Sequence, residues 1–168
     1  MKALKPDRFV SRVDVIDPRE ILDQGVAGVL IDLDNTLKPR DRSDVPVELA
    51  DWVGTLKDAG LKVCLLSNNW HETVSGVADR LGIAYVSKAV KPLPFSYLIG
   101  MRRMGTNRRD TLMIGDQIFT DVLGARLLGL PVWAVPPLAK HDLAHTLFLR
   151  KVERALVGEL IPEDSVDD

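Results

Sequence analysis

Two aspartates two residues apart, Asp32 and Asp34, directly follow the apolar run 25–31. An ionised carboxylate is a competent nucleophile toward phosphorus, and a second carboxyl group beside it can carry the proton that such a reaction moves. Both side chains can share one site if the backbone leaves a strand at this point. The alternative is that Asp34 and Asn35 simply form a turn.

Polar residues of matching chemistry follow three further apolar runs. Ser67 comes after 61–66, Lys91 a few residues after the weaker run 83–86, and Asp116 after 111–114. A serine hydroxyl, with the neighbouring Asn68, can bind a phosphate oxygen, and a lysine can neutralise the charge that builds during phosphoryl transfer. A carboxylate can bind Mg²⁺, which prefers oxygen ligands. Asp121, about one helical turn after Asp116, could hold a metal-bound water or orient Lys91.

Each of these residues also has an ordinary structural explanation. Ser67, or either asparagine after it, could cap a helix. Lys91 could be a solvated surface lysine, and Lys88 competes with it for the same role. Asp116 could be an acidic residue favoured by a helix dipole. The order of the four positions, each at the end of a successive apolar run, favours one shared site.

The elements that must position these residues alternate regularly. The four runs named above and a fifth, 130–135, are short and continuous, which is typical of strands buried on both faces. Amphipathic helices are predicted over 46–59, 71–81, 94–104, 119–128 and about 142–157. This alternation predicts an α/β fold with an open, doubly wound, five-stranded parallel sheet, which binds ligands at the carboxyl ends of its strands.

Composition sets the wider frame. The 168 residues fit a single domain spanning 1–168, with 46% apolar residues and a net charge of −2. With no strong basic excess, no nucleic-acid partner is expected. The only cysteine, Cys64, is expected to be a buried apolar residue. His141 and His145 lie four apart, but with no third ligand nearby they are interpreted as a surface pair.

The chain contains neither a signal-peptide-like segment nor the ~20-residue apolar stretch that a membrane-spanning helix needs. It is therefore expected to be cytoplasmic. The last predicted helix mixes apolar and basic residues, which suits peripheral contact with a membrane but equally suits packing on the sheet. Trp70 could lie at the mouth of the site or pack against the sheet.

Four segments in this order resemble the four motifs of the haloacid dehalogenase superfamily: 32–37, Ser67, Lys91-Pro92, and Gly115-Asp116 with Asp121. The resemblance covers 26–135. A narrower resemblance, to the YqeG-like branch of subclass IIIA, covers nearly the whole chain. It depends on segments 65–69 and 115–124, together with 4–7 and 150–154.

The resemblance implies a Rossmann-like core whose central strand carries the nucleophile, Asp32, with Asp34 as general acid and base. It also implies Mg²⁺ held by the Asp32 side chain, the Asp34 backbone carbonyl and the Asp116 side chain. Thr36 and Asp121 are supporting residues, and Ser67, Asn68 and Lys91 bind the substrate phosphate. The expected activity is that of a phosphatase acting on phosphate monoesters.

The spacing of the motifs leaves no room for a cap domain, since about thirty residues separate Leu37 from Ser67 and fewer separate Ser67 from Lys91. An open site suits a bulky substrate. Mitochondrial and plastid relatives of the branch hydrolyse phosphatidylglycerophosphate, which makes a lipid phosphate one candidate. A phosphoprotein, a nucleic-acid end or a non-catalytic binding role are the alternatives. The oligomeric state is left open.

Overall fold

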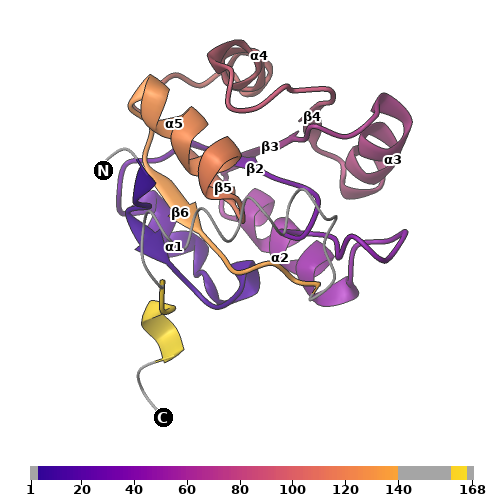
Figure 1. Ribbon diagram of the computed structural model, residues 1–168, viewed down its shortest axis with the longest axis horizontal. Helices are drawn as coiled ribbons and strands as arrows, with labels where there is room; N and C mark the ends of the chain where they lie inside the picture. The colour runs from indigo at the N-terminus through magenta and orange to yellow at the C-terminus, as the bar shows by residue number, and fades with distance from the viewer. Residues whose placement is uncertain (1–3, 140–159, 166–168) are drawn as a thin grey trace.

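The computed structural model describes residues 4–139 and 160–165, and in this part of the chain six parallel strands form one sheet (Figure 1). Their order across the sheet is β1-β6-β5-β2-β3-β4. Their bounds are Arg8–Phe9, Gly28–Ile31, Lys62–Leu66, Ala84–Val86, Thr111–Gly115 and Val132–Ala134 for β1 to β6. The strand that directly precedes Asp32, β2, is therefore an inner strand between β5 and β3.

Alternate strand residues build two hydrophobic layers, one on each face of the sheet. Val29 and Ile31 face one cluster and Leu30 faces the other. The first layer is covered by α1 (Pro18–Leu22), α2 (Val47–Asp58) and α3 (His71–Leu81); the second by α4 (Pro94–Met104) and α5 (Leu123–Leu128). Figure 1 shows α4 and α5 on the opposite side of the sheet from α1 and α2. The predicted doubly wound α/β fold is confirmed.

The prediction of five strands is wrong by one. The additional strand, β1, has only two residues and pairs with β6 at the edge of the sheet. Asp7 helps to hold it there, because its carboxylate accepts hydrogen bonds from Val132 N–H (2.8 Å) and the Arg126 guanidinium (2.7 Å). A strand this short and this dependent on distant partners has no periodicity in the sequence.

The helices differ from the prediction in two places. The segment predicted as one helix over 119–128 is a π-helix, Ile118–Val122, followed by α5. The N-terminal helix α1 was not predicted, although Asp17 and Glu20 form a capping box at its start. The helix predicted at about 142–157, with His141 and His145, lies outside the described residues. Every helix in residues 4–139 and 160–165 is too short or too polar to cross a bilayer.

Candidate active site

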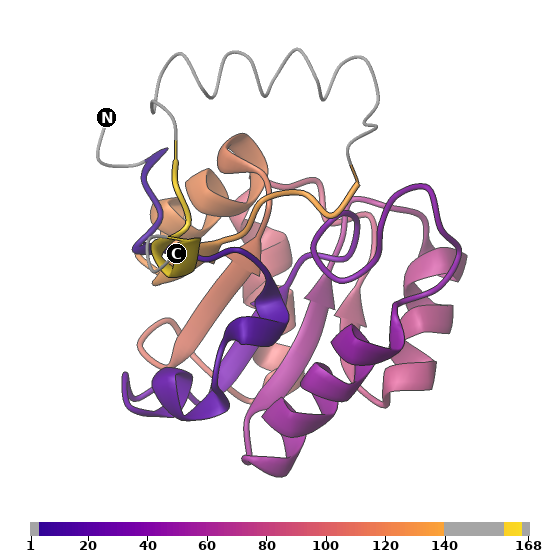
Figure 2. The ribbon, with the colours of Figure 1, turned by 90° about the horizontal axis from the view of Figure 1, so that it is seen from below.

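The register of the inner strands brings the predicted site residues to one edge of the sheet. Ile31, the last residue of β2, lies opposite both Leu65 and Ile114, and β3 and β5 each end one residue later, so these parallel strands (Figure 2) end within one residue of each other. Asp32 directly follows one strand, Ser67 the second and Asp116 the third. This edge, beyond the carboxyl ends of parallel strands, is where doubly wound folds bind their ligands.

Lys91 lies at the centre of the group. Its ammonium Nζ is 2.5 Å from Asp32 Oδ1 and 2.7 Å from Asp121 Oδ1. All three side chains are at least nine-tenths buried. The competing candidate, Lys88, is exposed, and its Nζ lies 4.3 Å from the centre of the Trp70 ring. Of the two lysines, Lys91 is therefore the one that can neutralise charge at Asp32.

Burial and charge shift the pKa values of this pair in a consistent way. Burial raises the pKa of Asp32 well above its ordinary value; Lys91 opposes this effect, whereas Asp121 and Asp116 add to it. Burial alone would lower the pKa of Lys91, but Asp121 and Asp32 outweigh it and raise that pKa above its ordinary value. Lys91 is thus a permanent cation, and a further positive charge would favour the ionised, nucleophilic form of Asp32.

Three buried carboxylates at the site offer oxygen ligands for such a charge. One carboxylate oxygen from each of Asp32, Asp116 and Asp121 lies within 4.8 Å of the other two. Asp121 is engaged on both sides, since its Oδ1 pairs with Lys91 and its Oδ2 accepts the Gln117 N–H at 3.1 Å. An all-oxygen set of this kind suits Mg²⁺, and the assignment of Asp32 and Asp116 as its side-chain ligands stays a prediction.

The turn that was the alternative explanation for Asp34 does form, and it carries Asp34 at the edge of the site. Asn35 has a φ of 67°, and its N–H donates to Lys38 O at 2.7 Å. The Asp34 carboxylate lies between two donors: Lys38 Nζ is 3.3 Å from Oδ1, and Asn69 Nδ2 donates to Oδ2 at 3.1 Å. The Thr36 hydroxyl lies 3.3 Å from Asp32 Oδ2 and 3.5 Å from Asp116 Oδ1, so it links two of the carboxylates.

The residues after β3 tie the site together. Ser67 Oγ accepts the Asn69 N–H at 3.0 Å, as a local turn would require, while the side chain stays buried beside Asp32's strand. The Asn68 amide brackets the Lys91 backbone, accepting its N–H at 2.7 Å and lying 3.5 Å from its carbonyl oxygen. Asn68 therefore fixes the position of Lys91, and its contact with a substrate phosphate stays a prediction.

Two neighbours of Asp34 were missed in the sequence. Lys38 is only 4% exposed, although a lysine in a turn is ordinarily solvated. The sequence predicts no more than a helix-capping role for Asn69, and it gives no sign that Asn69, rather than Asn68, contacts Asp34. The sequence offers one signal for the contact with Lys38: this lysine lies four residues after Asp34, a spacing at which a turn can bring the two side chains together.

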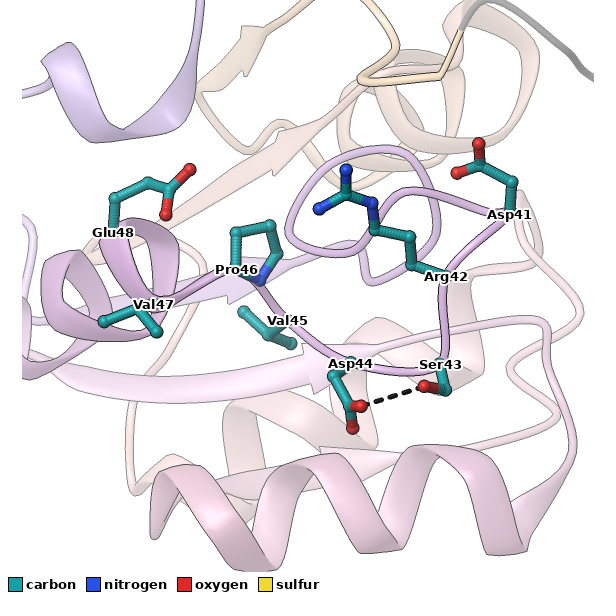
Figure 3. A pocket seen from close by; sticks show the side chains of 8 residues that line it. All are labelled: Asp41, Arg42, Ser43, Asp44, Val45, Pro46, Val47 and Glu48. Atoms are coloured by element: carbon teal, nitrogen blue, oxygen red, sulfur yellow. Dashed lines mark hydrogen bonds between the residues drawn. The ribbon is translucent and has the colours of Figure 1, made fainter.

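A surface hollow lies next to this turn but does not contain the site. Its eight lining residues form the continuous stretch 41–48, which runs from the loop after the Asp34 turn into the first residues of α2 (Figure 3). Ser43 and Asp44 are hydrogen-bonded to each other at 2.8 Å within it. Its link to the site is indirect, through the carbonyl oxygen of Arg42, which accepts a hydrogen bond from Lys38 Nζ at 3.0 Å.

Comparisons with known proteins agree with this fold and motif order. The family model of haloacid dehalogenase-like hydrolases matches residues 17–129. The chain is 36% identical over 159 residues to the probable phosphatase YqeG of Bacillus subtilis, covering 95% of this chain and 92% of that protein.

Two solved structures share the fold. One is the cobalt-bound deoxy-D-mannose-octulosonate 8-phosphate phosphatase of Haemophilus influenzae, with a TM-score of 0.58, 17% identity and coverage of 82% of this chain and 90% of that one. The other is a putative 3-deoxy-D-manno-octulosonate 8-phosphate phosphatase of Vibrio cholerae, with a TM-score of 0.54, 15% identity and coverage of 86% and 92%.

The chain belongs to the haloacid dehalogenase-like hydrolases, and the resemblance to the YqeG-like branch is confirmed. The segments in which larger members of this superfamily insert caps hold only α2 with β3, and α3 with β4. The predicted absence of a cap domain therefore agrees with the described structure.

Proposed function

We propose that this phosphatase hydrolyses phosphate monoesters with Mg²⁺ as cofactor and Asp32 as a covalent nucleophile. The observation that carries the proposal is the buried contact of Lys91 with Asp32 and Asp121, beside the Asp116 carboxylate. Held by Asp32, Asp116 and the Asp34 backbone carbonyl, Mg²⁺ would supply positive charge at the transferring phosphoryl group.

The residues divide the reaction into two steps. In the first, an Asp32 carboxylate oxygen bonds to phosphorus as the ester P–O bond breaks, and the Asp34 carboxyl group gives its proton to the leaving oxygen. In the second, Asp34 takes a proton from a water molecule, whose oxygen attacks phosphorus and breaks the Asp32–phosphorus link. Lys91 stabilises the charge on the phosphoryl oxygens in both steps.

The test is phosphate release from p-nitrophenyl phosphate in Mg²⁺ by Asp32→Asn. The amide is nearly isosteric but a poor nucleophile, so turnover should fall by orders of magnitude, roughly 10³-fold or more, without loss of folding. The matched control is Asp58→Asn, an exposed aspartate at the end of α2, on the opposite edge of the sheet. If Asp32→Asn kept turnover within tenfold of the parent, Asp32 would not be the nucleophile. If the parent itself turned over no phosphate ester, a non-catalytic binding role would be favoured.

A specific observation favours a lipid phosphate, such as phosphatidylglycerophosphate, as the substrate. Three apolar residues that lie close to the site residues in the sequence have exposed side chains: Trp70 (71%), Val90 (54%) and Leu93 (48%). Trp70 follows the Ser67 segment, and Val90 and Leu93 lie on either side of Lys91-Pro92. We propose that these side chains form an apolar rim at the opening of the phosphate site, so that a head group could reach Asp32 while the rim contacts the bilayer surface, in addition to any contact made by the terminal segments.

The lipid proposal can be tested through the fluorescence of one side chain. Trp52 and Trp133 are buried and Trp70 is exposed, so vesicles with brominated acyl chains should quench Trp70 selectively. Trp70→Phe should lose this signal, and the parent should prefer the lipid in vesicles to p-nitrophenyl phosphate. Absence of both quenching and preference would instead favour a soluble substrate, to be sought among phosphopeptides and phosphorylated oligonucleotides.

A further inference from the structure

A buried lysine outside the four motifs holds the general acid and base. Lys38 is 4% exposed, and its Nζ lies 3.3 Å from Asp34 Oδ1 and donates to Arg42 O at 3.0 Å. A lysine side chain is rarely buried unless its charge has a partner, because desolvation of the ammonium is costly. Its partners here are one carboxylate and the carbonyl oxygens of the loop that follows.

Asn69 holds the other oxygen of the same carboxylate. Its Nδ2 donates to Asp34 Oδ2 at 3.1 Å, while its Oδ1 accepts the Trp70 N–H at 2.7 Å. The second bond fixes the amide so that its NH₂ group faces Asp34. Two donors, one from the turn after β2 and one from the loop after β3, thus each hold a different oxygen of the Asp34 carboxyl group and restrict its rotation.

The turn itself keeps Lys38 in reach. Asp34 and Lys38 form a backbone bridge, and Lys38 N–H donates to Leu33 O at 2.9 Å. Leu33 and Leu37 are fully buried, so the turn is anchored to the hydrophobic core beneath it. The position of Lys38 Nζ is therefore set by packed backbone as well as by its own hydrogen bonds.

We propose that Lys38 and Asn69 are positioning residues that hold the Asp34 carboxyl group in the orientation needed for proton transfer to the leaving oxygen. This inference rests on the proposed function of Asp34. A general acid contributes only when its proton lies within hydrogen-bond reach of the atom that receives it. A carboxyl group that rotates freely spends much of its time in orientations that cannot donate.

Leaving-group basicity separates this role from a structural one. A weakly basic leaving group, such as dinitrophenolate, departs without a proton, whereas a strongly basic one needs the proton from Asp34. Loss of the positioning residues should therefore lower kcat/KM for esters with strongly basic leaving groups and leave it nearly unchanged for esters with weakly basic ones. A general loss of folding or of phosphate binding would lower turnover of all esters alike.

The experiment measures kcat/KM for a series of substituted phenyl phosphates, from dinitrophenyl to unsubstituted phenyl phosphate, because kcat/KM reports steps up to the first phosphoryl transfer. Lys38→Met and Asn69→Ala should each lose less than threefold on the dinitrophenyl ester. On phenyl phosphate each should lose roughly 10- to 100-fold, which is no more than the roughly 10²- to 10⁴-fold that a general acid contributes. The double variant should approach Asp34→Asn, and its loss should be less than the product of the single losses.

Two controls and a second test variant keep the outcomes separate. Lys62→Met removes an exposed lysine at the start of β3 and should match the parent. Inhibition by inorganic phosphate should be unchanged in the variants if the phosphate site is intact. Asn69 is only half-buried, so Asn69→Ala keeps the inference testable if Lys38→Met does not fold.

Equal losses at every leaving group, or no loss at any, would overturn the positioning role. If Asp34→Asn itself showed no dependence on the leaving group, the assignment of Asp34 as general acid would be wrong and the inference would fall with it. Selective losses in Asp34→Asn but uniform losses in Lys38→Met and Asn69→Ala would refute the inference alone.

Discussion

Substitution of Lys91 by methionine tests the electrostatics of the site most directly. The change keeps an unbranched side chain of similar length but removes the ammonium group 2.5 Å from Asp32 and 2.7 Å from Asp121. Both carboxylates are then buried together without the cation between them. Removing one partner of a buried ion pair destabilises a protein by roughly 3–5 kcal/mol. For a chain of this length, that corresponds to a decrease in Tm of roughly 6–20 °C.

The size of the effect should depend on pH, with a sign that follows from the pKa of Asp32. That pKa is raised in the folded protein, so protonation of Asp32 stabilises the fold at low pH, and this contribution is lost as pH rises through the folded pKa. Lys91 is the group that lowers this pKa, so Lys91→Met moves it higher still. The penalty from Asp32 should be constant until pH reaches the raised pKa of Asp32 in the folded parent and should grow above it, by up to about 1.4 kcal/mol per pH unit for that one proton.

This penalty can be measured by urea denaturation without divalent metal, at pH values that rise from about 4, the ordinary carboxyl pKa, to about 8. The matched control is Lys88→Met, which removes an exposed lysine from the same loop. Its effect should be within about 0.5 kcal/mol of zero at every pH. If Lys91→Met cost no more than Lys88→Met at neutral pH, or if its penalty decreased with rising pH, the described arrangement of charges would be wrong.

Three further predictions concern the metal, a glycine and the phosphate site. Mg²⁺ at about 100 times its Kd should stabilise the parent by about 2.7 kcal/mol, which raises its Tm by several degrees. EDTA should reverse this rise, and Asp116→Ala should abolish both the rise and the activity. Full activity in EDTA would contradict the metal dependence. Gly115→Ala should destabilise the folded protein by roughly 1–3 kcal/mol and lower turnover, because the added Cβ would overlap the Asp121 carboxylate. The control Gly54→Ala adds a Cβ in open space within α2, so its effect on stability should be neutral or slightly favourable. Beryllium fluoride soaked into crystals should bind at Asp32 beside Ser67 and Lys91, and density elsewhere would remove these residues from the site.

The strands and most helices could be predicted because their signals are local. Each inner strand is a continuous apolar run, and α3 and α4 end where glycine adopts a positive φ, at Gly82 and Gly105. The edge strand β1 could not be predicted, because its position depends on Asp7 contacts with residues about 120 positions away. Its two residues carry no pattern of their own.

The candidate site divides in the same way. Asp32, Ser67 and Asp116 follow the strand ends directly, so the order of elements places them together. Lys38 and Asn69 were missed because burial of a turn lysine and the choice between two adjacent amides are decided by packing between loops. The spacing of residues in the sequence therefore predicts neither the burial of Lys38 nor the contact made by Asn69.

The loop that delivers Lys91 shows why the last part of the site depends on tertiary contacts. Lys88 and Val90 have φ values of 48° and 53°, a region that ordinary side chains rarely adopt and that is least favourable for a β-branched residue. Hydrogen bonds from Lys88, Ala89 and Lys91 N–H groups to the segment 67–69 hold the loop in this conformation. The result places Ala89 and Lys91 inward and Val90 outward. Local strain of this kind persists where surrounding contacts over-determine it. The loops after β3 and β4 therefore act as one unit, which carries Ser67 and Lys91 on its inner side and the exposed Trp70 and Val90 on its outer side.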